Sequence, residues 1–531
     1  MKMLILGAAF AGLLAGTATA QTVTLQSGAV RGTTDAGVTA FKGIPFAAAP
    51  VGGLRWRAPQ PVNPWQGVRD ATRFGADCVQ VATPFAGPPN PVGTSEDCLF
   101  INVWRPAAIA PGKKLPVMVW IYGGAFLFGS GAQPSYDGTQ FARQDVILVS
   151  PNYRLGRFGF FAFPGLGKDH PGEGTGNFAF MDQIAALKWV KANIGKFGGD
   201  PGNVTIFGES AGGVSVHNLL TSPKAKGLFH KAIIESGGGR DGTLTARPLK
   251  ADNADANYPV SAETIGLNFA KRHGIEGTDA AALAKLRALS AEQVLDGGKE
   301  TAGGPEAPRT YAGPMLDGRV VTETAESAYR AGRQAHVPLM IGSNSAEMPG
   351  GFLAAKNKQE LFDSFGKGKA AAMAAYDPDG KADFATLLTN VTTDRVWAEP
   401  ARLTARAFVQ RGTPAYLYRF SYVADSLKDK LTAGAPHASE IEYVFGTLGN
   451  RLGTSLTERD ASVVRMMNSY WANFARDGNP NGSGLANWPR FTVAGNEILD
   501  MANDGAMRGG PDPERARIDA TELSEGKVIA R

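Results

Sequence analysis

Cysteine is scarce in this sequence, whose 531 residues include only two, Cys78 and Cys98. No further cysteine or nearby histidine stands at metal-ligand spacing from them, which argues against a zinc site. An excess of charge is also lacking, because 54 basic residues face 49 acidic ones and the formal net charge is +5. We find no Lys/Arg run or basic stripe of the kind that a nucleic-acid-binding surface needs. We therefore expect neither a metal centre nor a nucleic-acid partner.

Long apolar runs are missing beyond the N-terminus, so no later segment reaches the roughly 20 residues that a membrane-spanning helix needs. At the N-terminus, Lys2 precedes a compact apolar stretch at 3–16, and a small-x-small pattern follows at 18–20. This order is typical of a signal peptide cleaved before Gln21. An uncleaved membrane anchor is the alternative, but the stretch is too short to span a bilayer. We expect residues 1–20 to be removed and the mature protein to be periplasmic or secreted, without a membrane span.

The two cysteines lie 20 positions apart, and the stretch between them reads as a loop. An exported protein with one nearby cysteine pair usually oxidises it. A disulfide that closes a loop of this size stabilises the fold by roughly 3 kcal/mol, mainly by restricting the unfolded chain. Two buried free thiols are the alternative, and both interpretations stay open at this point.

Short apolar runs rich in Val and Ile recur along the chain, each bounded by turn residues, at 115–121, 146–150, 203–207, 231–234, 337–341 and 415–420. Runs that are apolar on both faces suit strands buried between two layers of helices. Helical patterns separate these runs, for example at 178–194 and 211–220. This alternation indicates an α/β fold with a mostly parallel central sheet and right-handed crossovers.

The remaining segments are expected to surround this sheet. Residues 22–46 and 98–104 predict an antiparallel lead-in with its own strands. Segments 241–330 and 350–412 are Ala-rich and helical with weak strand signal, so we expect insertions that lie over the sheet. No repeat, linker or low-complexity tail divides the chain, and we expect one catalytic domain over residues 21–531.

The clearest chemical motif is Gly-Glu-Ser-Ala-Gly at 208–212, between the predicted strand 203–207 and a predicted helix. This is Gly-x-Ser-x-Gly in the strand–turn–helix context that the motif requires. The glycines leave room for a sharp, strained turn, and the N–H groups at the start of the helix point at the site. The motif predicts Ser210 as a nucleophile. The alternative is a tight surface turn that happens to contain serine and has no catalytic role.

A second motif, Trp-Ile-Tyr-Gly-Gly-Ala-Phe at 120–126, ends the apolar strand predicted at 115–121. A glycine-rich loop there lets backbone N–H groups face a substrate without obstruction, and one such donor typically contributes about 3 kcal/mol to stabilising an oxyanion. A tight turn without a chemical role is the alternative. The order of this loop and the later nucleophile favours a hydrolase.

The acid and the base follow from chain order, which in this layout runs Ser, acid, His. Glu347 lies in a loop-like segment after a predicted core strand, where the acid is expected. Six histidines are present, and His437 is the only one beyond Glu347. His217 and His230 lie too close to Ser210 in the sequence to satisfy the order. We therefore predict His437 as the general base.

Two other carboxylates, Glu323 and Glu326, are alternatives to Glu347 as the acid. They lie in a helical pattern, TETAESAYRAG, where we expect a solvated face to be their role. Glu347 is therefore preferred.

Four segments together resemble the type-B carboxylesterase family: GESAG after NVTIF, EDCLFINV at 96–103, WIYGGAF at 120–126 and NYRLG at 152–156. This family of α/β-hydrolases includes cholinesterases and bacterial esterases of the para-nitrobenzyl type. The resemblance covers residues from about 22 to about 500, with the motifs in the family's order and approximate spacing. It implies the α/β-hydrolase fold and the hydrolysis of carboxylic esters.

Carried over residue by residue, the resemblance implies Ser210 as nucleophile, Glu347 as acid and His437 as base. It also implies a Cys78–Cys98 disulfide and Ser236 as a polar support near the triad. The oxyanion hole would consist of the N–H groups of Gly124, Ala125 and Ala211.

This sequence departs from the family at two places. Ala125 stands where many members have a third glycine, but its N–H remains available. Ala346 and Met348 flank Glu347, where many members have an acidic residue before the acid and glycine after it. The acid itself is retained.

The expected function is that of an exported serine carboxylesterase that acts through an acyl-enzyme on a small-molecule ester and uses no metal or organic cofactor. A serine amidase or peptidase uses the same triad and stays open as an alternative. A non-catalytic binding module could share the fold, but such a protein would be expected to lose the nucleophile or the base, and this chain retains both.

Overall fold

The computed structural model describes residues 19–242, 244–298 and 308–524 of the chain. A sheet of 13 strands runs through the described part, in the order β1-β2-β3-β7-β9-β8-β12-β13-β16-β17-β18-β19, with β4 paired to β2. Its N-terminal part consists of β1 (Thr19–Thr24), β2 (Ala29–Asp35), β3 (Val38–Pro45), β4 (Val68–Asp70) and β7 (Phe100–Pro106). Strands β1, β2, β3 and β7 pair antiparallel, as the lead-in segments predict.

The middle of the sheet is parallel. It contains β8 (Leu115–Ile121), β9 (Ile147–Pro151), β12 (Gly199–Glu209), β13 (Lys231–Glu235), β16 (Leu339–Asn344), β17 (Ala415–Phe420) and β18 (Glu497–Met501), and β19 (Met507–Pro511) closes the edge antiparallel to β18. All seven residues of β8 are buried, as expected for a strand covered on both faces. The predicted mostly parallel sheet with flanking helices is confirmed.

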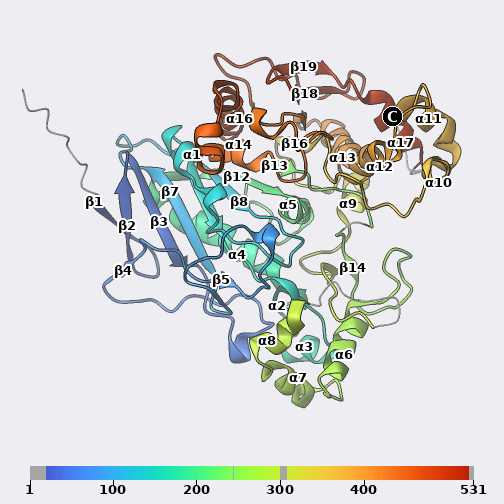
Figure 1. Ribbon diagram of the computed structural model, residues 1–531. Coiled ribbons are helices and arrows are strands. Elements are labelled where there is room, and N and C mark those ends of the chain that lie inside the picture. Colours follow the sequence, from blue (N-terminus) through green and yellow to red (C-terminus); the bar gives the residue numbers. More distant parts are fainter. Residues whose placement is uncertain (1–18, 243, 299–307, 525–531) are drawn as a thin grey trace, which may run out of the picture.

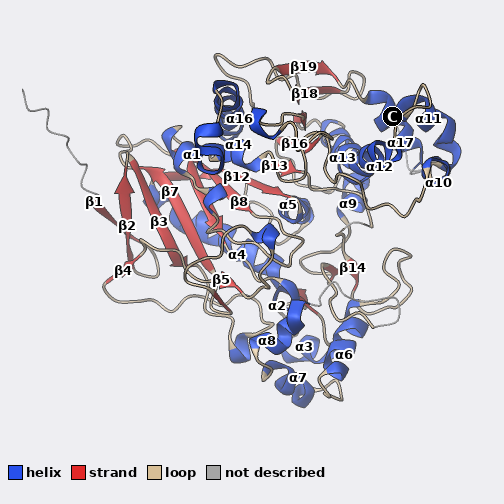
Figure 2. Cartoon of the chain, in the orientation of Figure 1, coloured by secondary structure: helices blue, strands red, loops and turns tan. Residues whose placement is uncertain are grey.

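Helices cover both faces of this sheet (Figure 2). Those that pack on its strands include α1 (Thr139–Arg143), α5 (Ala211–Thr221), α13 (Glu399–Val409) and α16 (Glu458–Asp477). Another helix, α4 (Phe178–Asn193), has twelve of its 16 residues buried. These buried residues are distributed around the helix and do not form a stripe along one face. A helix of this kind belongs in the interior of a large core.

The two segments predicted as insertions contain several helices in their described parts, and the first also contains loops and the short strands β14 (Arg247–Pro248) and β15 (Met315–Leu316). The first contains α6 (Ala262–Arg272), α7 (Ala280–Arg287), α8 (Ala291–Leu295) and α9 (Ala325–Ala331), and the first three lie together at the lower end of Figure 1. The second contains α10 (Lys358–Asp363), α11 (Lys369–Tyr376), α12 (Phe384–Thr393), the π-helix η7 (Asp394–Ala398) and α13. A second, smaller hydrophobic cluster joins this segment to Ala520 of α17 (Arg515–Ser524).

Cys78 and Cys98 form a disulfide whose Cα atoms are 4.9 Å apart. Both residues are buried, and Cys78 ends the short strand β5 (Asp77–Cys78). The disulfide prediction is therefore confirmed, and the alternative of two free thiols is wrong.

The predicted signal peptide falls outside the described residues except for its end. Thr19 and Ala20 pair with Thr34 and Thr33 in the first rungs of β1. No helix in the described ranges is long and apolar enough to cross a membrane. In the same ranges no group of three or more His, Cys, Asp or Glu side chains is arranged to hold a metal ion.

Candidate active site

Ser210 lies at the turn between β12 and α5. Its backbone has φ 55° and ψ −122°, a strained combination for a residue with a side chain. The turn is fixed by a hydrogen bond of 2.9 Å from the Ser210 N–H to the carbonyl oxygen of Glu235 on the neighbouring strand β13. The structure therefore contains the sharp strand-to-helix turn that the motif predicts.

The two glycines of the motif are required by close backbone contacts. A Cβ at Gly212 would lie 1.9 Å from the carbonyl oxygen of Ile121, and a Cβ at Gly208 would lie 2.6 Å from the same atom. Real Cβ atoms do not approach a backbone oxygen so closely. Glycine at both positions therefore lets the start of α5 pack against the end of β8, which brings Ser210 beside the glycine-rich loop.

This loop leaves β8 and passes next to the nucleophile turn. A Cβ at Gly123 would lie 3.0 Å from the Ser210 Cβ, so the missing side chain opens the approach to the serine. Gly124 and Ala125 both have positive φ, 100° and 53°. Among the described residues, neither donates its N–H in a hydrogen bond within the loop or to a side chain. Ala211 opens α5, and the first N–H groups of a helix have no intrahelical partner. These are the three donors named for the oxyanion hole.

Glu347 and His437 come together although 90 residues separate them. The Glu347 Oε2 atom lies 2.6 Å from His437 Nδ1, and the His437 N–H donates to the Glu347 carbonyl oxygen at 2.8 Å. Glu347 follows β16, and His437 lies in the loop between β17 and α14 (Ile441–Phe445). Neighbouring parallel strands thus deliver the two side chains to the same edge of the sheet.

Polar groups hold the Glu347 carboxylate in one orientation. Its Oε1 accepts hydrogen bonds from the Ser236 hydroxyl at 2.6 Å and from the Asn344 N–H at 2.8 Å. The Glu347 N–H donates to Thr393 Oγ1 at 3.1 Å. Ser236 was predicted as a polar support, whereas Thr393 was not identified from the sequence. Because Glu347 is fully buried, these bonds replace the solvation that the carboxylate loses.

The second ring nitrogen of His437 faces a carboxylate that the sequence analysis did not single out. His437 Nε2 lies 3.2 Å from the Oε1 atom of Glu209, the residue before Ser210. Among the described residues, no hydrogen bond joins the Ser210 hydroxyl to His437. The structure therefore brings the predicted acid and the predicted base together and places the predicted nucleophile one residue from the Nε2 contact.

Several buried carboxyl groups lie around His437 and influence its pKa. Burial opposes the charged imidazole, but the carboxylates of Glu209 and Glu347 outweigh this effect and hold the pKa of His437 well above its usual value. Burial also raises the pKa of Glu209, although the imidazole partly offsets this increase. Glu235 and Glu440, both fully buried nearby, have pKa values raised first by burial and then by neighbouring carboxylates. The site is thus built to accommodate a positive imidazolium.

An aromatic ring covers His437. The ring centroids of Trp397 and His437 are 5.3 Å apart with an interplanar angle of 44°, and the partly exposed Phe352 contacts Trp397 edge-on. By contrast, His217 is buried away from this site and its Nδ1 pairs with the Tyr329 hydroxyl. Chain order had already excluded His217 as the base.

The sequence profile of the carboxylesterase family matches residues 19–518 of the chain. Para-nitrobenzyl esterase of Bacillus subtilis is 36% identical over 517 residues, which cover 94% of this chain and 98% of that protein. The chain belongs to the carboxylesterase family. A member of this family is a carboxylic ester hydrolase, which agrees with the expected enzyme class.

Further relatives of this carboxylesterase carry related names. Fumonisin B1 esterase of Sphingopyxis macrogoltabida is 36% identical over 506 residues, covering 92% of this chain and 88% of that protein. Carboxylesterase 5A of Canis lupus familiaris is 37% identical over 489 residues, which cover 86% of this chain and 80% of that protein. A solved PNB esterase has a TM-score of 0.77 at 34% identity and covers 95% of this chain and all of that chain (100%). This likeness confirms the α/β-hydrolase fold.

Proposed function

We propose that this carboxylesterase is an exported serine hydrolase that cleaves carboxylic esters with Ser210 as nucleophile, His437 as base and Glu347 as acid. The observation that carries the proposal is the 2.6 Å contact between Glu347 Oε2 and His437 Nδ1 beside the strained turn at Ser210. A carboxylate at Nδ1 fixes the tautomer in which Nε2 is free to accept a proton, which is the orientation a general base requires.

In the first half of the reaction, Ser210 Oγ attacks the ester carbonyl carbon and its proton passes to His437 Nε2. The carbonyl oxygen gains the negative charge and accepts hydrogen bonds from the N–H groups of Gly124, Ala125 and Ala211. The carbon–oxygen bond to the alcohol then breaks, and the alcohol leaves with the proton from Nε2. The product of this half is an ester between the substrate's acyl group and Ser210.

Water completes the cycle. It attacks the acyl carbon while Nε2 accepts one of its protons, and the carboxylic acid leaves as the proton returns to Ser210 Oγ. The proposed steps use side chains and backbone N–H groups of this chain together with one water molecule from solvent. Because Nε2 contacts Glu209 in the structure, proton transfer requires Nε2 to exchange this contact for one with Ser210 Oγ.

The substrate class follows from the family. The names of the relatives refer to para-nitrobenzyl esters and to fumonisin B1, so esters with bulky alcohol or acid parts are within the family's range. For this chain we propose small-molecule esters in general. Comparison of turnover on an ester and on the matched amide tests this choice, because faster turnover of the amide would favour the amidase alternative.

A fluorophosphonate probe tests the nucleophile. The probe is expected to label the wild-type enzyme at one serine, and mass spectrometry is expected to place the label on Ser210. The Ser210→Ala variant should take up no label, whereas Ser222→Ala, which alters the serine at the end of α5, should react like the wild type. Label on another serine, or an active Ser210→Ala variant, contradicts the proposal.

The disulfide and the N-terminal pattern support export. Disulfides persist in oxidising compartments, and the pattern at residues 1–20 is that of a cleaved signal peptide. We expect N-terminal sequencing of the protein recovered from periplasm or culture medium to begin at Gln21. A mature chain that retains residues 1–20 contradicts this part of the proposal.

A further inference from the structure

The π-helix η7 contacts the proposed base, and the residue just before η7 contacts the proposed acid. Trp397, within η7, places its ring 5.3 Å from the ring of His437. Thr393, immediately before η7, accepts the N–H of Glu347 at 3.1 Å. One short segment therefore borders two residues of the proposed triad that come from other parts of the chain.

A π-helical turn is an unusual conformation in this position. The π-helix η7 lies between the α-helices α12 and α13, and the three segments follow one another without a break. It is therefore a wider turn within one long helical segment. Such turns are rare inside α-helices and are found frequently at functional sites. They persist where surrounding interactions determine them. The contacts at the two ends of η7 therefore need an explanation.

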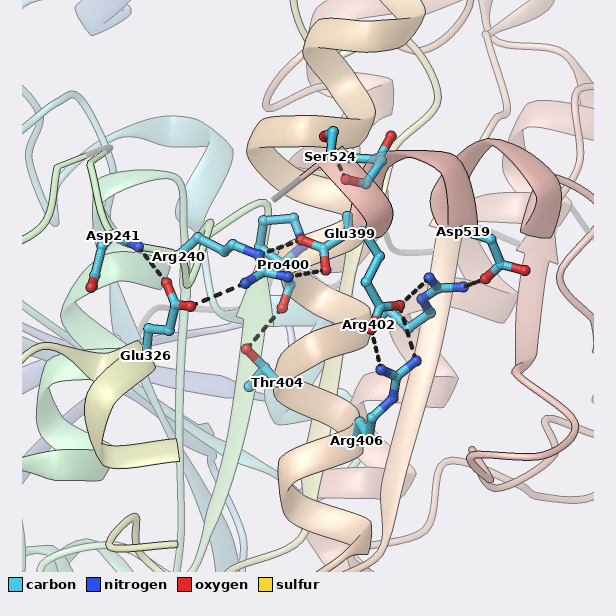
Figure 3. A network of polar contacts seen from close by, with 12 residues as sticks. Arg240, Asp241, Glu326, Glu399, Pro400, Arg402, Thr404, Arg406, Asp519 and Ser524 are labelled. Carbon is cyan, nitrogen blue, oxygen red and sulfur yellow. Dashed lines mark hydrogen bonds and ion pairs between the residues drawn. The ribbon is translucent and has the colours of Figure 1, made fainter. Parts of the chain in front are cut away.

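A buried ion pair holds the C-terminal end of η7. Glu399, the first residue of α13, accepts a hydrogen bond of 2.6 Å from Arg240 Nε, and a second bond joins its other oxygen to the same guanidinium (Figure 3). Both side chains are buried. Burial raises the pKa of Glu399, and Arg240 works in the opposite direction. In the described part of the chain, the hydrogen bonds of this carboxylate go to Arg240 and not to a residue of the proposed triad.

Arg240 is itself held from the other side. Figure 3 shows its guanidinium between Glu399 and Glu326, and the distance from Nη1 to Glu326 Oε1 is 3.0 Å. The Asp241 N–H also donates to Glu326 at 3.0 Å. The expectation that Glu326 lies on a solvated helix face is wrong, since only 3% of it is exposed. Its partner, Arg240, lies 86 positions earlier, which no helical pattern reveals.

A second set of contacts holds the N-terminal end of η7. Asp394, its first residue, accepts hydrogen bonds from the Tyr376 hydroxyl at 2.7 Å and from Arg517 Nε at 2.9 Å. Arg517 belongs to α17, which also pairs with α13: Arg402 contacts Asp519 and Glu522, and Arg406 contacts Glu522 (Figure 3). Both ends of the π-helix are thus tied to neighbouring elements by charged groups.

We propose that the ion pairs of Glu399 with Arg240 and of Asp394 with Arg517 set the position of Trp397 against His437, so that Glu399 and Asp394 are positioning residues for ester hydrolysis. The proposal rests on the proposed role of His437 as the base. Buried ion pairs are weak contributors to stability because desolvation offsets their attraction, but they can select one conformation over others. Here the conformation selected is a turn that α-helical hydrogen bonding alone does not favour. The indole of Trp397 then limits the swing of the imidazole and excludes water from one of its faces.

The decisive experiment is a double-mutant cycle between Glu399→Gln and Trp397→Ala. We measure kcat and KM for a short p-nitrophenyl ester. Glu399→Gln is expected to lower kcat by about tenfold and to leave KM within about twofold, because the residue touches no substrate. Trp397→Ala is expected to lower kcat by at least as much, and Trp397→Phe to retain most of it. The double variant should be no slower than Trp397→Ala, because both changes act through the same ring.

The matched control is Asp519→Asn. It removes a carboxylate from the same network, at a half-exposed position that contacts Arg402 and not η7. Its kcat should stay within about twofold of the wild type. Should Glu399→Gln fail to fold, Asp394→Asn replaces it at the opposite end of η7 with the same expected results. Folded variants at 399 or 394 with unchanged kcat, or effects that multiply in the double variant, overturn the inference.

A readout without substrate separates this inference from the proposed function. The proton between His437 Nδ1 and Glu347 gives a downfield NMR resonance, which should shift or broaden in Glu399→Gln and Trp397→Ala and stay in place in Asp519→Asn. An unmoved resonance in the first two variants overturns the inference even if hydrolysis is confirmed. Absence of ester turnover and of fluorophosphonate labelling in the wild type overturns the proposed function and leaves the resonance test decisive for the positioning of His437.

Discussion

His437 Nε2 lies 3.2 Å from Glu209 Oε1, so the imidazole has a carboxylate at each of its nitrogen atoms. Glu209 occupies the variable position of the Gly-x-Ser-x-Gly motif, which joins the nucleophile and this charge in consecutive residues. During the proposed attack a proton moves to Nε2 and the ring becomes positive. An ionised carboxylate beside the ring stabilises that positive state.

The first prediction concerns Glu209→Gln. The proposed base accepts a proton only when neutral, so activity falls as the pH drops below the pKa of His437. Glu209 raises this pKa, and its neutralisation must lower it. We therefore expect the acid limb of the kcat/KM profile to move to lower pH by about 1 unit or more. The pKa of His437 is raised to about 10, so rates measured from roughly pH 5 to 11 contain the limb and test this.

The control for this experiment is Glu323→Gln, which removes a charge paired with Arg333 on the surface. Its profile should coincide with that of the wild type. A limb that stays in place or moves to higher pH in Glu209→Gln contradicts the electrostatic role of Glu209. A wild-type rate that does not change between roughly pH 5 and 8 argues against His437 as the base.

The second prediction concerns Ser236→Ala. The hydroxyl donates to Glu347 Oε1 at 2.6 Å, and its loss leaves the Asn344 N–H as the remaining donor to that atom. We expect kcat to fall by roughly tenfold while KM changes little, since the carboxylate that orients His437 becomes less constrained. Stability should decrease by about 1 to 2 kcal/mol in urea titrations. Unchanged kcat in a folded variant shows that the Asn344 donor suffices.

The third prediction concerns Gly212, which lets the start of α5, next to Ser210, pack against the end of β8. Gly212→Ala places a Cβ 1.9 Å from the Ile121 carbonyl oxygen, and neither backbone can move without disturbing the sheet. We expect a loss of about 3 kcal/mol or more in unfolding free energy, or failure to fold. Gly195→Ala is the matched control, because a Cβ there meets no atom within 4 Å. Equal stability of the two variants contradicts the packing argument.

The fourth prediction concerns the disulfide. Replacing both Cys78 and Cys98 with Ala removes a cross-link between residues 20 positions apart. The expected cost is about 3 kcal/mol of unfolding free energy, mostly from the greater freedom of the unfolded chain. Urea denaturation of wild type and variant measures it. The same loss should appear when the wild type is unfolded with a reductant present, and a stable reduced wild type contradicts the prediction.

Patterns local to the sequence predicted the sheet well. The apolar run at 115–121 coincides with β8, and the run at 415–420 coincides with β17. The predicted strand 203–207 proved longer, because β12 begins at Gly199. Its first residues, Gly-Asp-Pro-Gly, are turn formers that carry no strand signal. Of these four residues only Gly199 is paired with β8, and the register shifts between Gly199 and Val204.

Contacts within the site were harder to predict from the sequence. Chain order led to Glu347 and His437 as the proposed acid and base, and the two side chains are in contact in the structure. The carboxylate of Glu209 and the ring of Trp397 had no such constraint. Both contact His437 across more than 35 positions of sequence, and neither hydrophobic periodicity nor a motif specifies a partner at that separation. The boundaries of the two helical insertions stay a prediction.

The tie between Asp394 and Arg517 spans 123 positions of the chain. Because Arg517 comes later in the chain, α17 must be synthesised before it can hold the N-terminal end of η7. Until then the turn beside the imidazole lacks one of its two supports. If the anchoring is needed for turnover, hydrolysis begins only after α17 has been synthesised and has packed against η7.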